Sequence, residues 1–510
     1  MTKSVKAVVI ASAALLVLGG VLLVLLLTGN KPDEQPVSSS VNSTDVTYIV
    51  QKKADEVTSI RVENGEGVFT FKRQKRVVSS TDSNGTVTSK DEYYWTTDDL
   101  KGVAQNDLTV RNFIAGLATL LENSRVEDAP DDFEKYGLAE PQSTAFLEFE
   151  DGTDIKMLFG IQNPADSKSI YFKTADSDGV SLVNYYAASV TLSDVRQFAE
   201  LTVTEALDTE GSNVLRFLKI TRPDLAEPIE IRYMSDMDEL ASNDDIMVST
   251  FNTHRFTAPV TAEVDLTKGQ DVCYKMYGLT MSSCEFLEQS AENLAKCGFD
   301  EPRAVVEFRY GGKDYKLTIG GEIREEISGE AASVSGLTGY YAMMDGVPGI
   351  YALSKDNAPW VNCDVSGLIS RRPLSPYIYS TATVDVTAPE GKYTFEIDTE
   401  NKKFFHNGDA LNSENFRTFY QFLISPVGEE LYSGEVSGTP MASVTFSYIE
   451  RYYDIYAAES DTIEYYADDG RKCIVVLNGE PIFRVSAIYV ERLSENIDAL
   501  LNGGTVGVTW

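Results

Sequence analysis

The first apolar run of the chain is long and carries no charge. Residues 7–27 read AVVIASAALLVLGGVLLVLLL. A helix of that length crosses the ~30 Å hydrocarbon layer of a bilayer. Lys3 and Lys6 precede the run, and Lys31 is the one basic residue that follows it closely. By the positive-inside rule, this pattern predicts a transmembrane helix over 7–27, a cytoplasmic N-terminus at 1–6, and a single-pass cell-membrane protein whose C-terminal bulk is extracytoplasmic.

A cleaved signal peptide is the alternative for the same residues. Its apolar part would be shorter and would end at a cleavage site of small residues, whereas Thr28, Gly29 and Asn30 follow here. We therefore expect the helix to remain as an anchor, and under either alternative the rest of the chain is exported. Residues 28–44 are polar and rich in proline and serine, which indicates a flexible tether.

Beyond the tether, one pattern of apolar and polar positions recurs. The segments YGLAEPQSTAFLEFEDGTDIKMLFG, from Tyr136, and CGFDEPRAVVEFRYGGKDYKLTIG, from Cys297, share glycines, a proline and alternating apolar positions. A degraded third copy lacks the Gly-x-x-x-Pro opening but keeps YYADDG at 465–470, which is similar to YYAMMDG at 340–346. The spacing of 160 residues between Gly160 and Gly320 suits whole domains rather than short stacked repeats.

Each copy predicts similar local structure. Gly137 and Gly298 suit a left-handed helix end, and the proline four residues later sends the chain into a strand. Alternating positions around Asp151-Gly152 and Gly311-Gly312 predict β-hairpins. Upstream, apolar positions at helical spacing predict an amphipathic helix in the first and third copies, and a Ser-x-x-Glu capping box predicts one in the second. The helical positions are Val110, Phe113, Ile114, Leu117, Leu120 and Leu121 in the first copy, Phe416, Phe419, Tyr420 and Leu423 in the third, and Ser282, Glu285, Leu287 and Leu294 in the second.

These patterns predict an α+β fold, in which a single N-terminal transmembrane helix is followed by repeated, mostly antiparallel β-sheet units, each with a short helix. We expect unit 1 at 45–205, unit 2 at 212–372 and a degenerate unit 3 at 376–505.

The composition argues against two classes of function. The chain has 510 residues and a net charge of −34. Such a charge argues against binding to nucleic acid, whose phosphates are held by Lys and Arg, and against docking on anionic lipid. Five sparse cysteines, with no C-x-x-C pair, predict small buried side chains. A bridge between Cys284 and Cys297 is the alternative.

Candidate chemistry is sparse. His254 and His406 lie 152 residues apart, and we expect both on the surface or in turns. The sequence lacks H-E-x-x-H, G-x-x-x-x-G-K-[ST] and G-x-S-x-G. We therefore assign no catalytic, cofactor-binding or metal-binding residue and expect no enzyme.

Acidic residues form small groups, which we expect in hairpins and solvated loops; a weak calcium site is the alternative. The groups are Glu127, Asp128, Asp131 and Asp132; Asp236, Asp238, Glu239, Asp244 and Asp245; Asp176 and Asp178 before Gly179; and Asp82 and Asn84 before Gly85.

Adjacent aromatic residues recur along the chain. Neighbours in a strand face opposite sides, so one of each pair should pack inward while the other faces out as a contact surface. The sets are Tyr93-Tyr94-Trp95, Tyr185-Tyr186, Tyr452-Tyr453 and Tyr465-Tyr466.

The chain resembles the DUF4340 family over about residues 47–354. The features that carry the resemblance are the apolar anchor, the YGL-x-x-P opening at Tyr136, the Asp-Gly hairpin, the strand that ends at Gly160 and the Tyr-Tyr strand. The second copy departs from the family pattern, with Cys297 in place of Tyr and Phe299 in place of Leu. The family has no known function. The resemblance implies an extracytoplasmic accessory role beside ABC-type export systems similar to those of gliding motility, and it supplies no catalytic residues.

We therefore expect a membrane-anchored, non-catalytic accessory or scaffold protein that contacts partner membrane proteins such as ABC-type transporter subunits. An extracytoplasmic binding module for a cell-wall component, glycan or peptide, is the first alternative. A carboxylate-based wall hydrolase is the second, although the sequence fixes no two carboxylates at the required separation.

Overall fold

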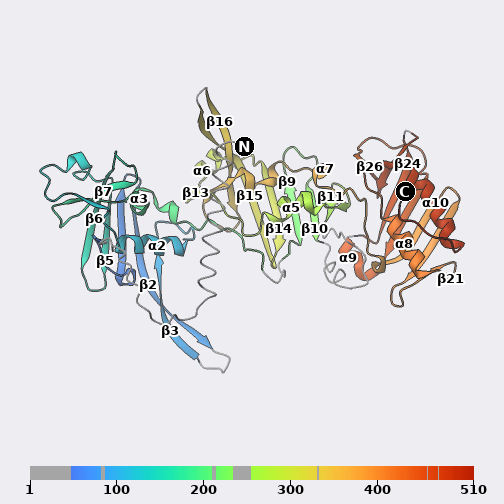
Figure 1. Cartoon of the computed structure of the whole chain (residues 1–510), viewed down its shortest axis with the longest axis horizontal. Helices are drawn as coiled ribbons and strands as arrows, with labels where there is room; N and C mark the ends of the chain where they lie inside the picture. Colours follow the sequence, from blue (N-terminus) through green and yellow to red (C-terminus); the bar gives the residue numbers. More distant parts are fainter. Residues whose placement is uncertain are drawn as a thin grey trace, which may run out of the picture. The chain divides into compact units, whose positions relative to one another are not determined.

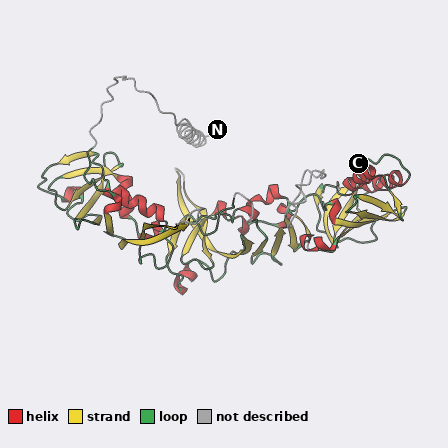
Figure 2. Ribbon diagram, turned by 90° about the horizontal axis from the view of Figure 1, so that it is seen from below, coloured by secondary structure: helices red, strands yellow, loops and turns green. Residues whose placement is uncertain are grey.

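The computed structural model describes residues 47–81, 87–208, 214–233, 254–329, 332–456, 458–468 and 470–509. Strands dominate these residues, while helices are few and short (Figures 1 and 2). The strands form three antiparallel sheets, which confirms the predicted α+β class. The helix predicted over 7–27 and the segments at 1–6 and 28–44 lie outside the described residues. Within the described ranges, no helix is both long and apolar enough to span a membrane.

The first sheet has the strand order β3-β2-β1-β5-β6-β7-β8-β4. In the sequence, helix α2 lies between β3 and the edge strand β4. The strands are β1 (Val57–Asn64), β2 (Gly67–Thr81), β3 (Val87–Thr96), β4 (Ser124–Glu127), β5 (Ser143–Phe149), β6 (Asp154–Gln162), β7 (Ser169–Thr174) and β8 (Val180–Asn184). The helical segments are η1 (Ala54–Glu56), α2 (Asp107–Ala118), η2 (Glu134–Tyr136), α3 (Tyr185–Ser189), η3 (Val190–Leu192) and η4 (Val195–Phe198).

The second sheet has the order β12-β11-β10-β9-β14-β15-β16-β17-β13. The strands are β9 (Phe217–Thr221), β10 (Ile229–Tyr233), β11 (His254–Ala258), β12 (Ala262–Glu263), β13 (Ser283–Phe286), β14 (Ala304–Tyr310), β15 (Lys313–Gly329), β16 (Ala332–Met344) and β17 (Ile350–Ser354). The helical segments are α5 (Leu266–Tyr274), α6 (Ala291–Lys296), η5 (Lys355–Asn357), η6 (Pro359–Val361) and α7 (Val365–Leu368).

The third sheet has the order β21-β20-β19-β18-β23-β24-β25-β26-β22. The strands are β18 (Thr381–Ala388), β19 (Gly391–Asp398), β20 (Lys403–His406), β21 (Asp409–Ala410), β22 (Glu430–Leu431), β23 (Ala442–Tyr448), β24 (Ser460–Ala467), β25 (Lys472–Leu477) and β26 (Glu480–Ser486). The helical segments are η7 (Ile378–Ser380), α8 (Ser413–Leu423), η8 (Glu450–Tyr452), α9 (Tyr453–Tyr456) and α10 (Ile488–Leu501).

The three sheets share one topology. In each, a meander at the start of the unit forms one side of the sheet, a helix follows, and the next strand lies at the opposite edge. The remaining strands then fill the middle, beginning beside the first strand of the unit. The third copy, which is degraded in sequence, therefore keeps the strand order of the second.

The helix that follows the first meander is capped in the same way in all three units. Asn106, Asp265 and Asn412 accept hydrogen bonds from backbone N–H groups in the first turns of α2, α5 and α8. Such side chains satisfy donors that have no partner inside the helix. The apolar faces of α2 and α8 pack on the sheets: Phe113 lies 6.5 Å from Phe69 on β2 between ring centroids, and Phe416 lies 4.4 Å from Phe404 on β20.

Two glycine pairs explain the shared opening of the first two copies. Gly137 and Gly298 have φ of 66° and 73°, a backbone conformation that side chains disfavour. Across from them, a Cβ on Gly160 would lie 2.1 Å from the Tyr136 carbonyl oxygen, and one on Gly320 would lie 2.5 Å from that of Cys297. The backbone of the loop therefore packs directly against the backbone of the neighbouring strand, and a side chain at Gly160 or Gly320 would not fit between them.

The third copy lacks this crossing. The strand register that pairs Ser143 with Phe159, and Ala304 with Ile319, pairs Ala442 with Tyr465. Tyr466 thus stands where the other copies have glycine. In place of the Gly-x-x-x-Pro opening, the third copy has Gly438, with φ of 94°, two residues before Pro440.

One predicted helix was wrong. Ser282 and Glu285 do not form a capping box, because residues Ser283–Phe286 form edge strand β13 against β17. The Ser283 hydroxyl donates to Glu285 at 2.6 Å within that strand. The helix of the second unit is α5, and the short helix α6 is capped by Ser290 instead.

The two predicted hairpin turns are confirmed. Gly152 has φ of 79°, and Gly311 and Gly312 have φ of 57° and 72°. The predicted unit boundaries at 45–205, 212–372 and 376–505 remain predictions, since the sheets occupy 57–184, 217–354 and 381–486 within one compact unit from Tyr48 onward.

Candidate functional site

The first and second sheets meet along the segment that leaves η4. Ala199 bridges to Gln105 in the first unit, and Thr202 bridges to Thr280 in the second. The Val203 amide donates to the Leu279 carbonyl at 2.9 Å, and the Met281 amide donates to that of Leu201 at 2.8 Å. We call this region, with the pockets beside it, the first junction. A single backbone segment thus connects two sheets by short ladders.

One pocket of about 420 Å³ lies beside these ladders. Arg196 organises it, because its guanidinium donates to the Asp194 carboxylate at 2.8 Å and to the Glu285 backbone carbonyl. Burial raises the pKa of the Asp194 carboxyl, but the hydrogen bonds and charge of Arg196 outweigh burial and hold that pKa below its usual range. The lining residues are Ser193, Asp194, Arg196, Gln197, Leu201, Ser282, Ser283, Cys284 and Glu285.

Cys284 lines this pocket but is poorly suited to nucleophilic chemistry. It is 5% exposed, and burial raises the pKa of its thiol to about 11. The thiolate is the nucleophile in cysteine chemistry. The thiol therefore stays protonated at neutral pH.

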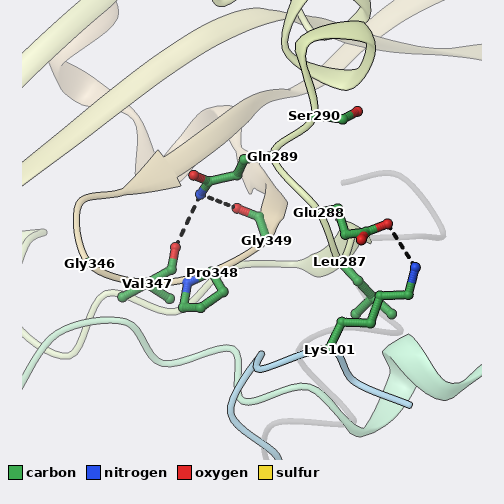
Figure 3. A pocket seen from close by; sticks show the side chains of 9 residues that line it. All are labelled: Lys101, Leu287, Glu288, Gln289, Ser290, Gly346, Val347, Pro348 and Gly349. Carbon is green, nitrogen blue, oxygen red and sulfur yellow. Dashed lines mark hydrogen bonds and ion pairs between the residues drawn. The ribbon is translucent and has the colours of Figure 1, made fainter. Parts of the chain in front are cut away.

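A second pocket of about 620 Å³ is shown in Figure 3. Lys101, from the loop after β3, forms an ion pair with Glu288 at 2.7 Å. Gln289 donates to the carbonyl oxygens of Gly349, at 2.9 Å, and Val347, at 3.2 Å. Apolar surface comes from Leu287, Val347 and Pro348. The pocket is open and mixes apolar surface with paired charges, a character that suits side chains of a protein or peptide better than bond-breaking chemistry.

The contact between the second and third sheets is built differently. Arg255 on β11 and Asp461 on β24 are 1% and 0% exposed and form a two-point ion pair, with distances of 2.8 and 2.5 Å. The Tyr448 hydroxyl and the Asn478 amide also donate to Asp461, at 2.5 and 2.8 Å. Burial raises the pKa of Asp461, but Arg255 and these donors outweigh it and hold that pKa below its usual range. We call this region the second junction.

The linker between these sheets joins the same buried network. Glu263 on β12 is 4% exposed and accepts hydrogen bonds from the Ser375 amide, at 2.7 Å, and the Ser375 hydroxyl. The Tyr456 hydroxyl accepts from the Tyr377 amide at 3.0 Å. The second junction thus fastens both sheets and the chain between them around buried polar groups.

Comparison with protein families bears on the first junction. Residues 95–226 match the model of a family described as Domain of unknown function (DUF4340). The chain carries a DUF4340 domain. The matched DUF4340 residues run from the end of β3 to just beyond β9, so Lys101, Asp194 and Arg196 lie inside them. The match is narrower than the expected 47–354 and does not reach the second copy at Cys297. Comparisons with curated proteins and with solved structures gave no match.

The two histidines lie apart from both pockets and outside the DUF4340 match. His254 is 2% exposed in β11, where its Nε2 lies 3.2 Å from the Leu215 carbonyl oxygen; the predicted surface or turn position was wrong for it. His406 ends β20, and its Nδ1 lies 2.8 Å from the Thr394 carbonyl oxygen, directly before a turn. The position of His406 beside a turn agrees with the prediction.

The acidic groups serve local structure where they are described. In the DUF4340 domain, Glu127 accepts from Lys135 at 2.8 Å and from the Tyr136 hydroxyl at 2.6 Å, and Asp132 accepts from the Glu134 amide at 2.7 Å. Over the described ranges, no three His, Cys, Asp or Glu side chains gather as metal ligands. The groups at 82–85 and 236–245 lie outside the described residues.

The adjacent tyrosines follow the predicted alternation only in strands. Trp95 and Tyr465 are buried while their neighbours Tyr94 and Tyr466 are partly exposed; Tyr93, on the same face as Trp95, is nevertheless 51% exposed. Tyr185-Tyr186 of the DUF4340 domain instead begin helix α3, where Tyr186 is 74% exposed. Tyr452-Tyr453 also lie in helical turns, η8 and α9.

All five cysteines are free, and four of them are buried, which fits the predicted role as small buried side chains. The alternative of a Cys284–Cys297 bridge is wrong in this structure. The residues missed by sequence reasoning are Arg196 and the Arg255–Asp461 pair. The two partners of that pair lie 206 residues apart, and no local pattern marks them.

Proposed function

We propose that this chain is a membrane-anchored, non-catalytic accessory or scaffold protein outside the cytoplasm, with residues 7–27 as its single-pass anchor. The single observation that supports it best is the first junction, where two open pockets with mixed apolar and paired polar linings flank the segment that connects two sheets. Concave surfaces of this character accept side chains from a partner protein. The DUF4340 match includes five lining residues of the smaller pocket, between Ser193 and Leu201, and Lys101 of the larger one.

We further propose that the partner is an integral membrane protein, such as a subunit of an ABC-type export complex. The expectation comes from the family resemblance, and the tether supports it. A chain held by an anchor at residues 7–27 and a tether at 28–44 would share its membrane with such a partner.

Co-purification tests the partner. The full chain is extracted in mild detergent with Val347→Arg, which places a charge in the apolar part of the larger pocket, and with Glu400→Arg as a control in an exposed turn of the third sheet. We expect the pocket variant to lose at least about tenfold of the co-purified export subunits, while the control retains them. If both variants co-purify equal amounts of the export subunits, the first junction is not the surface that binds the partner.

Protease treatment of intact cells tests the topology. An exported chain is cut down to a short anchored stub while cytosolic markers survive. If the chain survives together with those markers, the extracytoplasmic location is wrong.

The exposed tyrosines favour one other function, a binding module for cell-wall glycan or peptide. Tyr93 and Tyr186 are 51% and 74% exposed, and rings at such positions stack on ligands. Retention of the full chain on purified wall polymer, reduced several-fold by Tyr186→Ser but unaffected by Val347→Arg, would favour this function over the scaffold.

A further inference from the structure

Two hairpins continue well past the sheets that hold them. Strand β2 has β1 as a neighbour only up to the Ser59–Lys72 pair, but it stays paired with β3 as far as Thr81 and Val87. Figure 1 shows β2 and β3 running beyond the rest of the first sheet. Strands β15 and β16 likewise continue past the Ala304–Ile319 pair as far as Gly329 and Ala332. A two-stranded ribbon is marginally stable in water unless something packs on it.

The two ribbons carry opposite charge. The basic ribbon, residues 72–81 and 87–96, has five basic and two acidic side chains: Lys72, Arg73, Lys75, Arg76 and Lys90 against Asp91 and Glu92. The acidic ribbon, residues 321–329 and 332–338, has three acidic and one basic: Glu322, Glu325 and Glu326 against Arg324. A net positive ribbon is an exception on a chain of net charge −34.

The basic ribbon also exposes apolar surface. Phe69 and Phe71 on β2 are buried beneath the face that α2 covers, and the two-residue period of a strand places Val77 on that same face. There Val77 is 66% exposed, and Val87 and Tyr93, on the same face of β3, are 62% and 51% exposed. The core-facing stripe of the sheet thus continues into the ribbon without a helix over it.

We propose that the basic ribbon of one chain docks on the acidic ribbon of a second copy. Charge complementarity selects this occupant. A lipid or nucleic-acid surface would repel most of this acidic chain, whereas the acidic ribbon is a complementary element that every copy carries. Docking through Lys72, Arg76 and Lys90 would also cover Val78, which lies on the same face of the ribbon and is 42% exposed.

Four of the five cations of the basic ribbon are available for such a contact, whereas the Arg73 side chain is 7% exposed and pairs with Glu150. Lys75 and Arg76 pair with Asp91 and Glu92 at 2.8 and 2.7 Å, but all four side chains are about half exposed, and such pairs exchange at little cost. Lys72 and Lys90 are exposed and show no ion pair to any described residue.

The contact joins two different surfaces, so it is heterologous. Each copy that uses its basic ribbon still presents its acidic ribbon, and the assembly grows into rows unless the rotation closes it. This inference goes beyond the proposed function and does not depend on the membrane anchor.

Sedimentation velocity of the full chain in detergent tests the proposal with a charge swap. Variant A carries Lys72→Glu and Lys90→Glu, which turn the basic ribbon net acidic. Variant B carries Glu325→Lys and Glu326→Lys, which turn the acidic ribbon net basic. A matched control, Lys355→Glu with Lys392→Glu, changes the net charge as variant A does but at exposed positions outside both ribbons.

We expect the wild-type chain and the control to form concentration-dependent dimers and larger species at about 50 mM salt that dissociate at about 500 mM, since salt screens exposed charges. Variants A and B alone should associate at least about tenfold more weakly. An equimolar mixture of A and B should recover the association, because A then offers an acidic surface to the basic surface of B.

Three results would overturn the proposal. The first is a wild-type chain that stays monomeric at every salt concentration. The second is association of A and B as strong as that of the wild type, and the third is a mixture of A and B that does not recover the association. Circular dichroism of both variants, matching that of the wild type, shows that a lost association does not come from a lost fold. If variant A instead reduces binding to vesicles rich in anionic lipid while the chain stays monomeric, the ribbon serves a membrane and the second copy is excluded.

Discussion

At the second junction Arg255 and Asp461 are 1% and 0% exposed, whereas at the first junction the side chains of Lys101 and Glu288 are 53% and 62% exposed. Both junctions join a sheet to the next one in the chain. One does so around a buried ion pair with two further hydrogen-bond donors, and the other does so through backbone ladders beside open pockets. Three copies of one topology are therefore joined, at two junctions, by contacts of different kinds.

The difference teaches where binding is expected. A buried ion pair adds little over an apolar contact, but removal of one partner is very costly, so such a pair fixes one arrangement of its neighbours. Exposed pairs contribute little and rearrange easily. Under the proposed function, the first junction is thus the place where a partner would gain surface without breaking the fold, whereas the second junction has to keep one arrangement.

The largest effect is expected from Asp461→Ala. It leaves Arg255 buried without its counter-charge and should lower the free energy of unfolding by about 3–5 kcal/mol. Urea denaturation of the purified chain measures this loss. The double variant Arg255→Met with Asp461→Leu serves as the control and should be more stable than Asp461→Ala alone, because no unpaired charge remains. Equal losses in both would show that the charge pair is not the cause.

A pH-dependent effect of the same pair comes next in size. The pKa of Asp461 is lower in the folded chain than its ordinary value of about 3.9. A carboxyl with a lowered folded pKa stabilises the fold above the unfolded pKa, and that contribution is lost as pH falls through the folded pKa. Between pH 7 and pH 2.5, the free energy of unfolding should therefore decrease more for the wild type than for Asp461→Asn. Parallel curves for the two proteins would contradict this assignment.

A smaller effect is expected from Arg196→Met at the first junction. The change removes the hydrogen bonds to Asp194 and to the Glu285 carbonyl, at a cost of roughly 1–2 kcal/mol for partly buried charged groups. Hydrogen exchange should increase in η4 and β13, while β11 and β24 at the second junction keep their protection. Faster exchange at both junctions would mean that the two do not open independently.

The smallest effect is expected from Glu288→Gln. Both side chains of the Lys101–Glu288 pair are more than half exposed, and such pairs contribute little to stability. The denaturation midpoint should stay within experimental error of the wild type. A clear loss of stability would show that the first junction is held by its charges, as the second junction is.

Local elements of the fold were predictable from sequence because short-range chemistry dictates them. Asp151-Gly152 and Gly311-Gly312 form the expected hairpins, and the apolar stripes of α2 and α8 are buried as expected, but Leu120 and Leu121 lie beyond the end of α2, and Leu121 is 42% exposed. The helix expected at Ser282 was wrong because Ser-x-x-Glu fits a capping box and an edge strand equally well. Helix α5 was missed because its apolar stripe is short and Gly269 interrupts it.

The junctions could not be predicted, since they depend on pairs far apart in the chain. Arg255 sits beside His254 in what reads as a polar surface segment, and only its pairing with Asp461 explains its burial. The degraded third copy was recognised from its resemblance to the Tyr-Tyr strand of the second copy, but that match was wrong by one strand: Tyr465 lies on β24, the counterpart of β15, whereas Tyr340 lies on β16. Nothing in the local sequence of Tyr466 indicates that it replaces a glycine at a backbone crossing.

Site-specific photo-cross-linking in living cells tests most directly whether the first junction contacts a partner. A photoreactive amino acid replaces Gln289, which lines the larger pocket (Figure 3), and in a second strain it replaces Glu400 in an exposed turn of the third sheet. A single discrete adduct with an integral membrane protein at position 289, absent at position 400, is the predicted result. Equal adducts at the two positions, or none at 289, would contradict the account.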